Sequence, residues 1–182
     1  MIIKFFIDGL ASLNLKKLDA SYNRKITNVN HMDKLEILNA AVDCGINDAG
    51  LKSVNLKILN ASHNSNISNV NHMDKLEILY AEGACGINDA GLASLNLKVL
   101  YANSNSKITN LNHMDKLEIL YAVGACGIND AGLSSLNLKK LFASNNQNIT
   151  NVNHMDKLEI LNAGGNCGNN KITKTKANIL RN

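Results

Sequence analysis

The chain has 182 residues, 45% of them hydrophobic and only 4% aromatic, with a formal net charge of +4. This length and hydrophobic content favour one folded domain with a sizeable core. The mild charge comes mainly from scattered lysines rather than from a clustered basic face, which does not favour a nucleic-acid binder. No run of about 18 apolar residues is present to span a membrane.

The N-terminal segment, residues 1–14, is predicted to be a cap. Its last residues, DGLASLN, match DAGLASLN at 89–96, whereas the residues before them form an apolar run. The first turn of a solenoid has an uncovered core that a cap must protect. We expect this role for Ile2, Ile3, Phe5, Phe6 and Ile7. The run MIIKFFI is too short for a signal-peptide core and lacks a cleavage-site pattern, so we expect an intracellular, cytoplasmic protein.

The rest of the chain is organised by tandem repetition. The stretch HMDKLEIL begins at His31, His72, His113 and His154, and each copy lies 41 residues after the last. Such strict spacing predicts a repeat architecture. Each period divides into an Asn unit of 20 residues and a Cys unit of 21 residues. The Asn units start at Leu15, Leu56, Leu97 and Leu138, and the Cys units start at Leu35, Leu76, Leu117 and Leu158. Residues 15–167 are therefore predicted to form eight units in four 41-residue pairs.

Each unit opens with the pattern Leu-x-x-Leu-x-Ala, which predicts a short strand. In the first unit Leu18 and Ala20 point inward, whereas Lys17 and Asp19 point outward. Strands that recur every 20–21 residues after a crossover pair in parallel. The return of each Cys unit begins with an Asn or Asp capping residue and is expected to run for about two helical turns. The return of each Asn unit is expected to hold only turns or 3-10 pieces.

These units resemble leucine-rich repeats, whose core pattern is LxxLxLxxN or LxxLxLxxC. The Cys unit, through CGINDAGL, is similar to the cysteine-containing class, and the Asn unit, through NxxITNV, is similar to the short class. The resemblance implies an α/β solenoid with a parallel sheet on one face and short helices and 3-10 turns on the other. It also implies an asparagine ladder at Asn23, Asn64, Asn105 and Asn146. In style, the Asn-, Lys- and Ile-rich repeats are similar to those of protists and amoebal giant viruses.

A charge alternation supports the strand pairing independently. The residue after each first leucine is Lys or Glu in strict alternation through Lys16, Glu36, Lys57, Glu77, Lys98, Glu118, Lys139 and Glu159. On paired strands each lysine would have a glutamate on either side. A slip by one unit would stack like charges, so the alternation favours a single register.

Neither the cysteines nor the histidines predict a chemical site. Cys44, Cys85, Cys126 and Cys167 lie two strands apart, about 9–10 Å, whereas a disulfide needs Cα atoms within about 7 Å. We expect free, buried thiols. The four repeated histidines do not converge with the cysteines as zinc ligands must. No nucleophile–base set, phosphate loop or metal motif is visible, so we expect no enzyme activity, no metal and no cofactor.

The differences between repeats that bear most on function lie on the outward face of the strands. Four consecutive strands carry an aromatic residue between the second Leu and Ala: Tyr80, Tyr101, Tyr121 and Phe142. The neighbouring outward row is aliphatic at Ile78, Val99 and Ile119. Tyrosine-rich exposed patches and the concave faces of solenoids are common partner sites. The competing interpretations are neutral drift of the copies, or rows that only stabilise the sheet through cross-strand pairs.

These observations predict a non-enzymatic protein–protein interaction module that binds another protein on its exposed sheet face. The alternative is a structural or self-assembling repeat protein, for example a particle or virion component, in which self-association uses the same patch. Residues 168–182 break the repeat and are basic and polar. They are predicted to form a C-terminal cap, with Ile172, Ile179 and Leu180 packing on the last unit, or else a tail.

Overall fold

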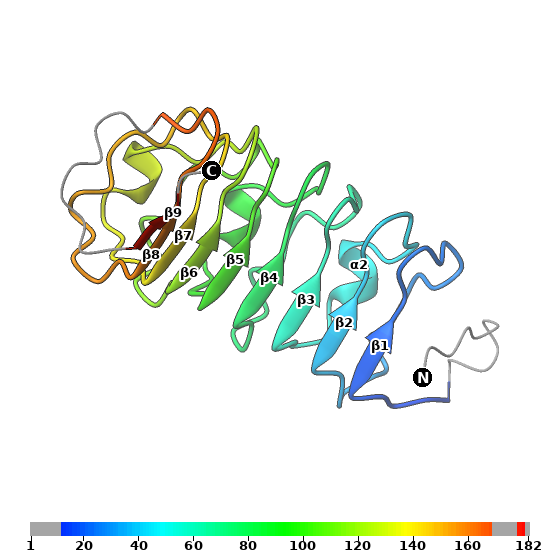
Figure 1. Ribbon diagram of the computed structural model, residues 1–182. Helices are drawn as coiled ribbons and strands as arrows, with labels where there is room; N and C mark the ends of the chain where they lie inside the picture. The colour runs from blue at the N-terminus through cyan, green and yellow to red at the C-terminus, as the bar shows by residue number, and fades with distance from the viewer. Residues whose placement is uncertain (1–11, 169–177, 181–182) are drawn as a thin grey trace.

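The protein is a parallel-strand solenoid. The computed structural model describes residues 12–168 and the backbone of residues 178–180. Three-residue strands form one parallel sheet in the order β1 to β9, so each strand pairs with the next along the chain (Figure 1). Their bounds are β1 (Lys17–Asp19), β2 (Ile37–Asn39), β3 (Ile58–Asn60), β4 (Ile78–Tyr80), β5 (Val99–Tyr101), β6 (Ile119–Tyr121), β7 (Lys140–Phe142), β8 (Ile160–Asn162) and β9 (Asn178–Leu180). The predicted repeat solenoid is confirmed.

The strand β9 lies beyond the eight predicted units. It pairs in parallel with β8 and places Ile179 opposite Leu161. It belongs to the segment 168–182, predicted as a cap or a tail, most of which lies outside the described residues. Residues 1–11 of the predicted N-terminal cap, including its five apolar residues, also lie outside them.

The helical segments of the described residues lie across from the sheet. They are the α-helix α2 (Asp48–Leu51) and the 3-10 helices η1 (Ala90–Leu92) and η2 (Ala131–Leu133). The predicted Asn cap is present, because the Asn47 side chain accepts a hydrogen bond from the Gly50 amide at 3.1 Å. The expectation of two helical turns is wrong. Each segment makes about one turn, because the chain must bring the next leucine back to the sheet within a few residues.

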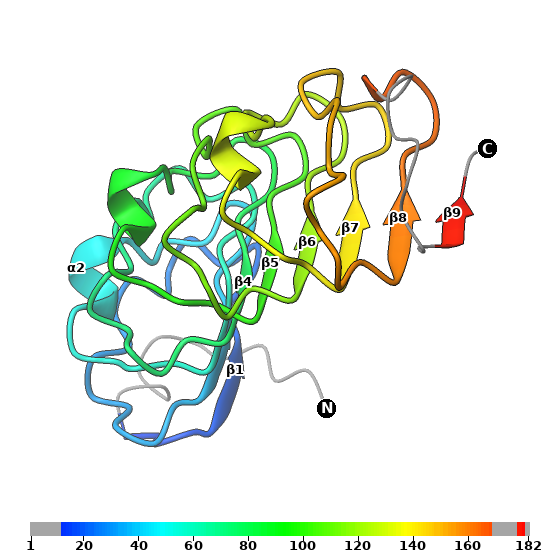
Figure 2. The same cartoon turned by 90° about the vertical axis from the view of Figure 1, so that its left-hand side faces the viewer.

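The solenoid curves, and the sheet lies on the inner, concave side of the curve. Figure 2 shows the strands along this inner side and the helical segments along the outer side. Within the described part of the chain, no helix combines the length and the apolar character that crossing a membrane requires.

The core lies between the sheet and the outer turns. The central leucine of each strand stacks on that of its neighbour, as Leu59 does on Leu38 and Leu79. These inward leucines are at most 7% exposed: Leu18, Leu38, Leu59, Leu79, Leu100, Leu120, Leu141 and Leu161. The alanine after each strand is buried as well. One continuous apolar column therefore runs the length of the coil.

Buried asparagines satisfy the backbone where the chain turns away from the sheet. The Asn105 amide donates to the carbonyl oxygens of Ala81 and Ile87, at 2.8 and 3.2 Å, and accepts from the Lys107 amide at 2.9 Å. Asn64 and Asn146 repeat this arrangement. Asn23 accepts from the Lys25 amide. Each of the three buried asparagines therefore ties its own turn to the preceding one, since a buried backbone group needs a partner.

Candidate functional site

The four predicted aromatic residues form a continuous stack on the concave face. Register pairs Tyr80 with Tyr101, Tyr101 with Tyr121, and Tyr121 with Phe142. Their ring centroids lie 4.1, 4.2 and 4.3 Å apart, and the planes of adjacent rings differ by 11°, 9° and 2°. We call these four side chains the aromatic column. The structure thus brings together four aromatic residues that belong to four separate repeat units.

The interior rings of the aromatic column offer edges and hydroxyl groups to solvent rather than ring faces. All four side chains are half-buried, and each interior ring has both faces covered by its neighbours. Burial, followed by hydrogen bonds with the hydroxyls of Tyr80 and Tyr121, raises the pKa of Tyr101 above its ordinary value of 10.0. This phenol is therefore neutral at physiological pH.

The predicted aliphatic row lies directly beside the column. Ile78, Val99 and Ile119 are in register and half-buried, and Lys140 follows them on β7. On the far side of the column the Asn103 amide donates to the Glu82 carboxylate. The concave face of β4 to β7 therefore carries an apolar and aromatic strip with polar neighbours.

A shallow hollow, which was not predicted from the sequence, adjoins the column at its N-terminal end. It has a volume of about 390 Å³ and lies over β1 to β4. Its lining residues are Lys17, Leu18, Asp19, Ile37, Leu38, Asn39, Ile58, Asn60 and Tyr80. The signal available in the sequence was the change from tyrosine at position 80 to the smaller Asn60, Asn39 and Asp19. We call this space the N-terminal hollow.

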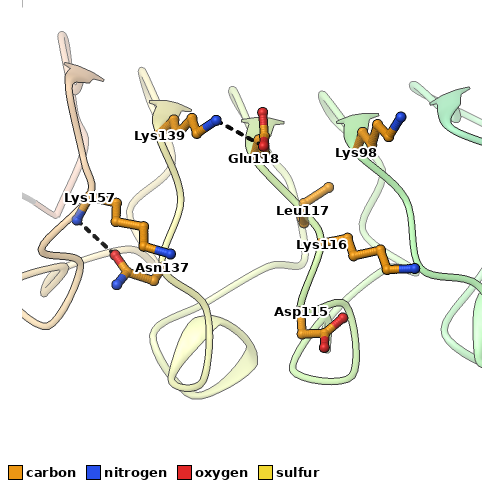
Figure 3. A pocket seen from close by; sticks show the side chains of 8 residues that line it. All are labelled: Lys98, Asp115, Lys116, Leu117, Glu118, Asn137, Lys139 and Lys157. Carbon is orange, nitrogen blue, oxygen red and sulfur yellow. Dashed lines mark hydrogen bonds and ion pairs between the residues drawn. The ribbon is translucent and has the colours of Figure 1, made fainter.

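A second, smaller cavity of about 230 Å³ lies at the edge of the sheet, where the chain enters the strands (Figure 3). Its lining residues are Lys98, Asp115, Lys116, Leu117, Glu118, Asn137, Lys139 and Lys157. Lys139 bonds Glu118 at 2.9 Å, which lowers the pKa of that carboxyl and raises the pKa of the lysine. Four lysines and two carboxylates line this cavity, so it has an excess of positive charge.

The predicted charge ladder is present along the same edge. Lys57 pairs with Glu36 at 3.2 Å and Lys98 pairs with Glu77 at 3.0 Å. In both pairs, and in Lys139–Glu118, the lysine binds the glutamate of the preceding strand. The pairing is therefore one-sided, rather than shared equally with the glutamates on both sides. Pairs this exposed contribute little stability, and their main effect is on register.

The thiols and histidines have structural surroundings. Cys44, Cys85 and Cys126 are buried as predicted, whereas Cys167 is half-buried, and all four are free. Burial raises the pKa of the Cys126 thiol to about 11, which keeps it protonated and unreactive. The Nε2 atoms of His72, His113 and His154 donate to the carbonyl oxygens of Leu51, Leu92 and Leu133, at 3.0 to 3.1 Å. Within residues 12–168 no three His, Cys, Asp or Glu side chains are grouped to hold a metal ion.

Comparison of the chain with protein-family models, with curated proteins and with solved structures finds no match. Its classification therefore follows from its own strand order and 41-residue period. On these grounds the chain is a repeat protein with a parallel-strand solenoid fold.

Proposed function

We propose that this protein is a non-enzymatic protein–protein interaction module, and that its partner binds the concave sheet face over β4 to β7. The observation that carries the proposal is the aromatic column, half-buried on the inner side of the curve with an aliphatic row beside it. We further propose that the chain is a leucine-rich repeat protein. The LxxLxA strands and the hydrogen-bonding asparagines at the ladder position support that assignment.

Physical reasons favour the column as a partner-binding surface. Aromatic side chains contribute much of the binding energy of protein interfaces, and tyrosine adds a polar tip to an apolar body. Stacking already holds these rings in place, so binding costs little side-chain entropy. Three hydroxyls in a row also supply hydrogen bonds of fixed spacing. The binding surface would therefore be preorganised for a partner.

Cross-strand stabilisation of the sheet is the competing explanation of the same rings. It predicts that removing rings lowers the stability of the protein and changes nothing else. Partner binding predicts instead a loss of capture in a protein that remains folded. The two explanations therefore separate when binding and stability are measured on one variant.

The test compares the wild type with a Tyr101→Ala/Tyr121→Ala double variant. The partner is first identified by affinity purification from the native source with mass spectrometry, and its recombinant form is then used for direct binding. We expect the double variant to remain folded by circular dichroism and to lose binding. Tyr22→Ala is the matched control, because Tyr22 is 74% exposed and lies outside the column. Undiminished binding by a folded double variant would reject the site.

Self-assembly is the alternative, since the same apolar strip could pair with that of a second copy. Light scattering behind size exclusion distinguishes the two functions. A protein that remains monomeric over a wide concentration range rules out self-assembly. Oligomers that the double variant abolishes would favour it over binding of a different partner.

A further inference from the structure

The aromatic column ends abruptly at Tyr80. One face of this ring is covered by Tyr101, 4.1 Å away and nearly parallel. The opposite face looks toward β3, where the residue in register is Asn60. An asparagine side chain is too small to cover a phenol ring, and Tyr80 accordingly lines the N-terminal hollow. The hollow thus has a flat aromatic wall on one side.

The floor of the hollow next to this wall is aliphatic. Ile58 and Ile37 are half-buried neighbours in register on β3 and β2, and their side chains form this floor. An aromatic wall and an aliphatic floor form an apolar corner. Such a corner favours a large apolar group, and a volume of about 390 Å³ has room for one large side chain with part of its main chain.

The polar rim of the hollow mainly offers hydrogen-bond donors. The Asn60 Oδ1 atom accepts from the Ser62 amide at 3.0 Å, and the Asn39 Oδ1 atom accepts from the Ala41 amide at 3.2 Å. These bonds orient both side chains. Neither Nδ2 group has a hydrogen-bond partner among the described residues, and Lys17 adds a further donor. At the far end of the rim the Asp19 carboxylate is an acceptor, and its Oδ1 atom already accepts from the amide and hydroxyl of Ser21. A ligand must therefore bring an acceptor to the Asn60 and Asn39 amides and apolar surface to the corner.

We propose that the N-terminal hollow is the subsite for one aromatic side chain of the partner. The ring stacks on the free face of Tyr80 above Ile58, and an adjacent main-chain carbonyl oxygen accepts from the Asn60 amide. This inference rests on the proposed function, because it names the part of a protein partner that the concave face selects. Aromatic anchors in pockets next to polar donors are typical of such binding hot spots.

The experiment uses three small probes and the full chain. N-acetyltryptophanamide carries the proposed ring and carbonyl groups, N-acetylalaninamide lacks the ring, and methyl glucoside represents a saccharide, which could also stack on Tyr80. Each is titrated while the NMR signals of the Ile58 methyl groups and the Asn60 side-chain amide are followed. We expect the tryptophan probe to bind about tenfold more tightly than the alanine probe, because only the tryptophan probe gains the free energy of partly burying a ring.

Two matched variants locate the binding. Asn60→Tyr adds a fifth ring that covers the free face of Tyr80, so the Ile58 signals should no longer respond to the tryptophan probe. Asn162→Tyr lengthens the column at its other end, beyond Phe142, and should leave the response unchanged. Both keep the stacking pattern already present, and circular dichroism checks that both fold.

Three results would overturn the subsite: equal affinity for the tryptophan and alanine probes, an unchanged Ile58 response in folded Asn60→Tyr, or a preference for methyl glucoside. These results are separate from those of the Tyr101→Ala/Tyr121→Ala test. If that double variant loses the partner while the tryptophan probe fails to bind wild type, the interaction function stands and the subsite fails. If the probe binds but the double variant retains the partner, the proposed site on the column fails.

Discussion

At the residue scale, one backbone position after the strand of each Cys unit has a left-handed conformation. Gly83, Gly124 and Gly165 occupy it with φ values of 60°, 72° and 64°. The first Cys unit has Val42 there instead, with φ of 40°. A β-branched residue pays a steric penalty in this region that glycine does not. The next residue, Asp43, is also left-handed, with φ of 48°, so the first Cys unit has two strained positions where the other three Cys units have one glycine.

Replacing Val42 with glycine should therefore stabilise the protein. Relief of the left-handed strain is worth about 1–2 kcal/mol, and the extra freedom of glycine in the unfolded chain removes about 0.5–1 kcal/mol of it. We expect the free energy of unfolding in urea to rise by about 0.5–1 kcal/mol. The reverse substitution, Gly124→Val, should lower it by a similar or larger amount. A Val42→Gly variant less stable than wild type would show that contacts of the valine outweigh the strain.

At the element scale, the glycine in each helical segment marks a close approach between turns. A Cβ atom at Gly91 would overlap the carbonyl oxygen of Ser68 on the neighbouring unit, and Gly50 and Gly132 meet Thr27 and Thr109 in the same way. The Gly91 carbonyl in turn accepts from the Val70 amide at 2.9 Å. These glycines are therefore required by packing between units.

Gly91→Ala should destabilise the protein, although alanine is normally the better helix former by about 1 kcal/mol. Because the obstructing atom is backbone, the neighbouring turn must move, and we expect a loss of about 2 kcal/mol of unfolding free energy. Ala93→Gly, at an exposed position just after the same helical segment, should cost only about 0.5–1 kcal/mol. Urea denaturation measures both. A stabilised Gly91→Ala variant would contradict the close approach.

Much of this element arrangement could be predicted from the sequence, because fixed spacing and alternating polarity determine which residues of a strand face inward. The positions of Leu18 and Leu59 and the parallel pairing follow from that pattern, whereas the turn asparagines were expected from the resemblance to leucine-rich repeats. Ring stacking does not, because register brings Tyr101 beside Tyr80 without determining the orientation of either ring. The N-terminal hollow depends on how far Lys17 and Ile58 extend, and the single helical turn depends on how soon the chain must return to the sheet. Both are properties of packing in three dimensions.

At the scale of the whole molecule, the structural unit is a pair of turns. The Asp89 carboxylate of a Cys unit accepts hydrogen bonds from the amide and hydroxyl of Thr109 in the following Asn unit. Asn105 of that Asn unit donates back to Ile87 of the Cys unit. Unlike turns are therefore joined by contacts that two like turns would not make.

Deleting residues 76–116 should accordingly leave a folded, shorter solenoid. The deletion joins Lys75 to Leu117 and recreates HMDKLEIL at the junction. We expect cooperative unfolding in urea with a smaller m-value, because less surface is exposed. Deleting residues 97–116 removes one Asn unit, sets Glu77 beside Glu118 and leaves Asp89 without Thr109. This second variant should be markedly less stable despite losing fewer residues. Equal stability of the two would show that single turns are interchangeable.

The stacked rings also limit the shape of the arc. Neighbouring strands in a sheet are spaced about 4.8 Å apart, whereas the ring centroids lie only 4.1 to 4.3 Å apart on the inner side of the bend. The rings are already close to contact, so the coil has almost no room to bend more sharply between β4 and β7. Over β1 to β3 the smaller side chains leave a gap, so no contact between rings limits the bending of the solenoid there. Any tightening of the arc is therefore left to the strands outside β4 to β7, among them β1 to β3, where the hollow lies.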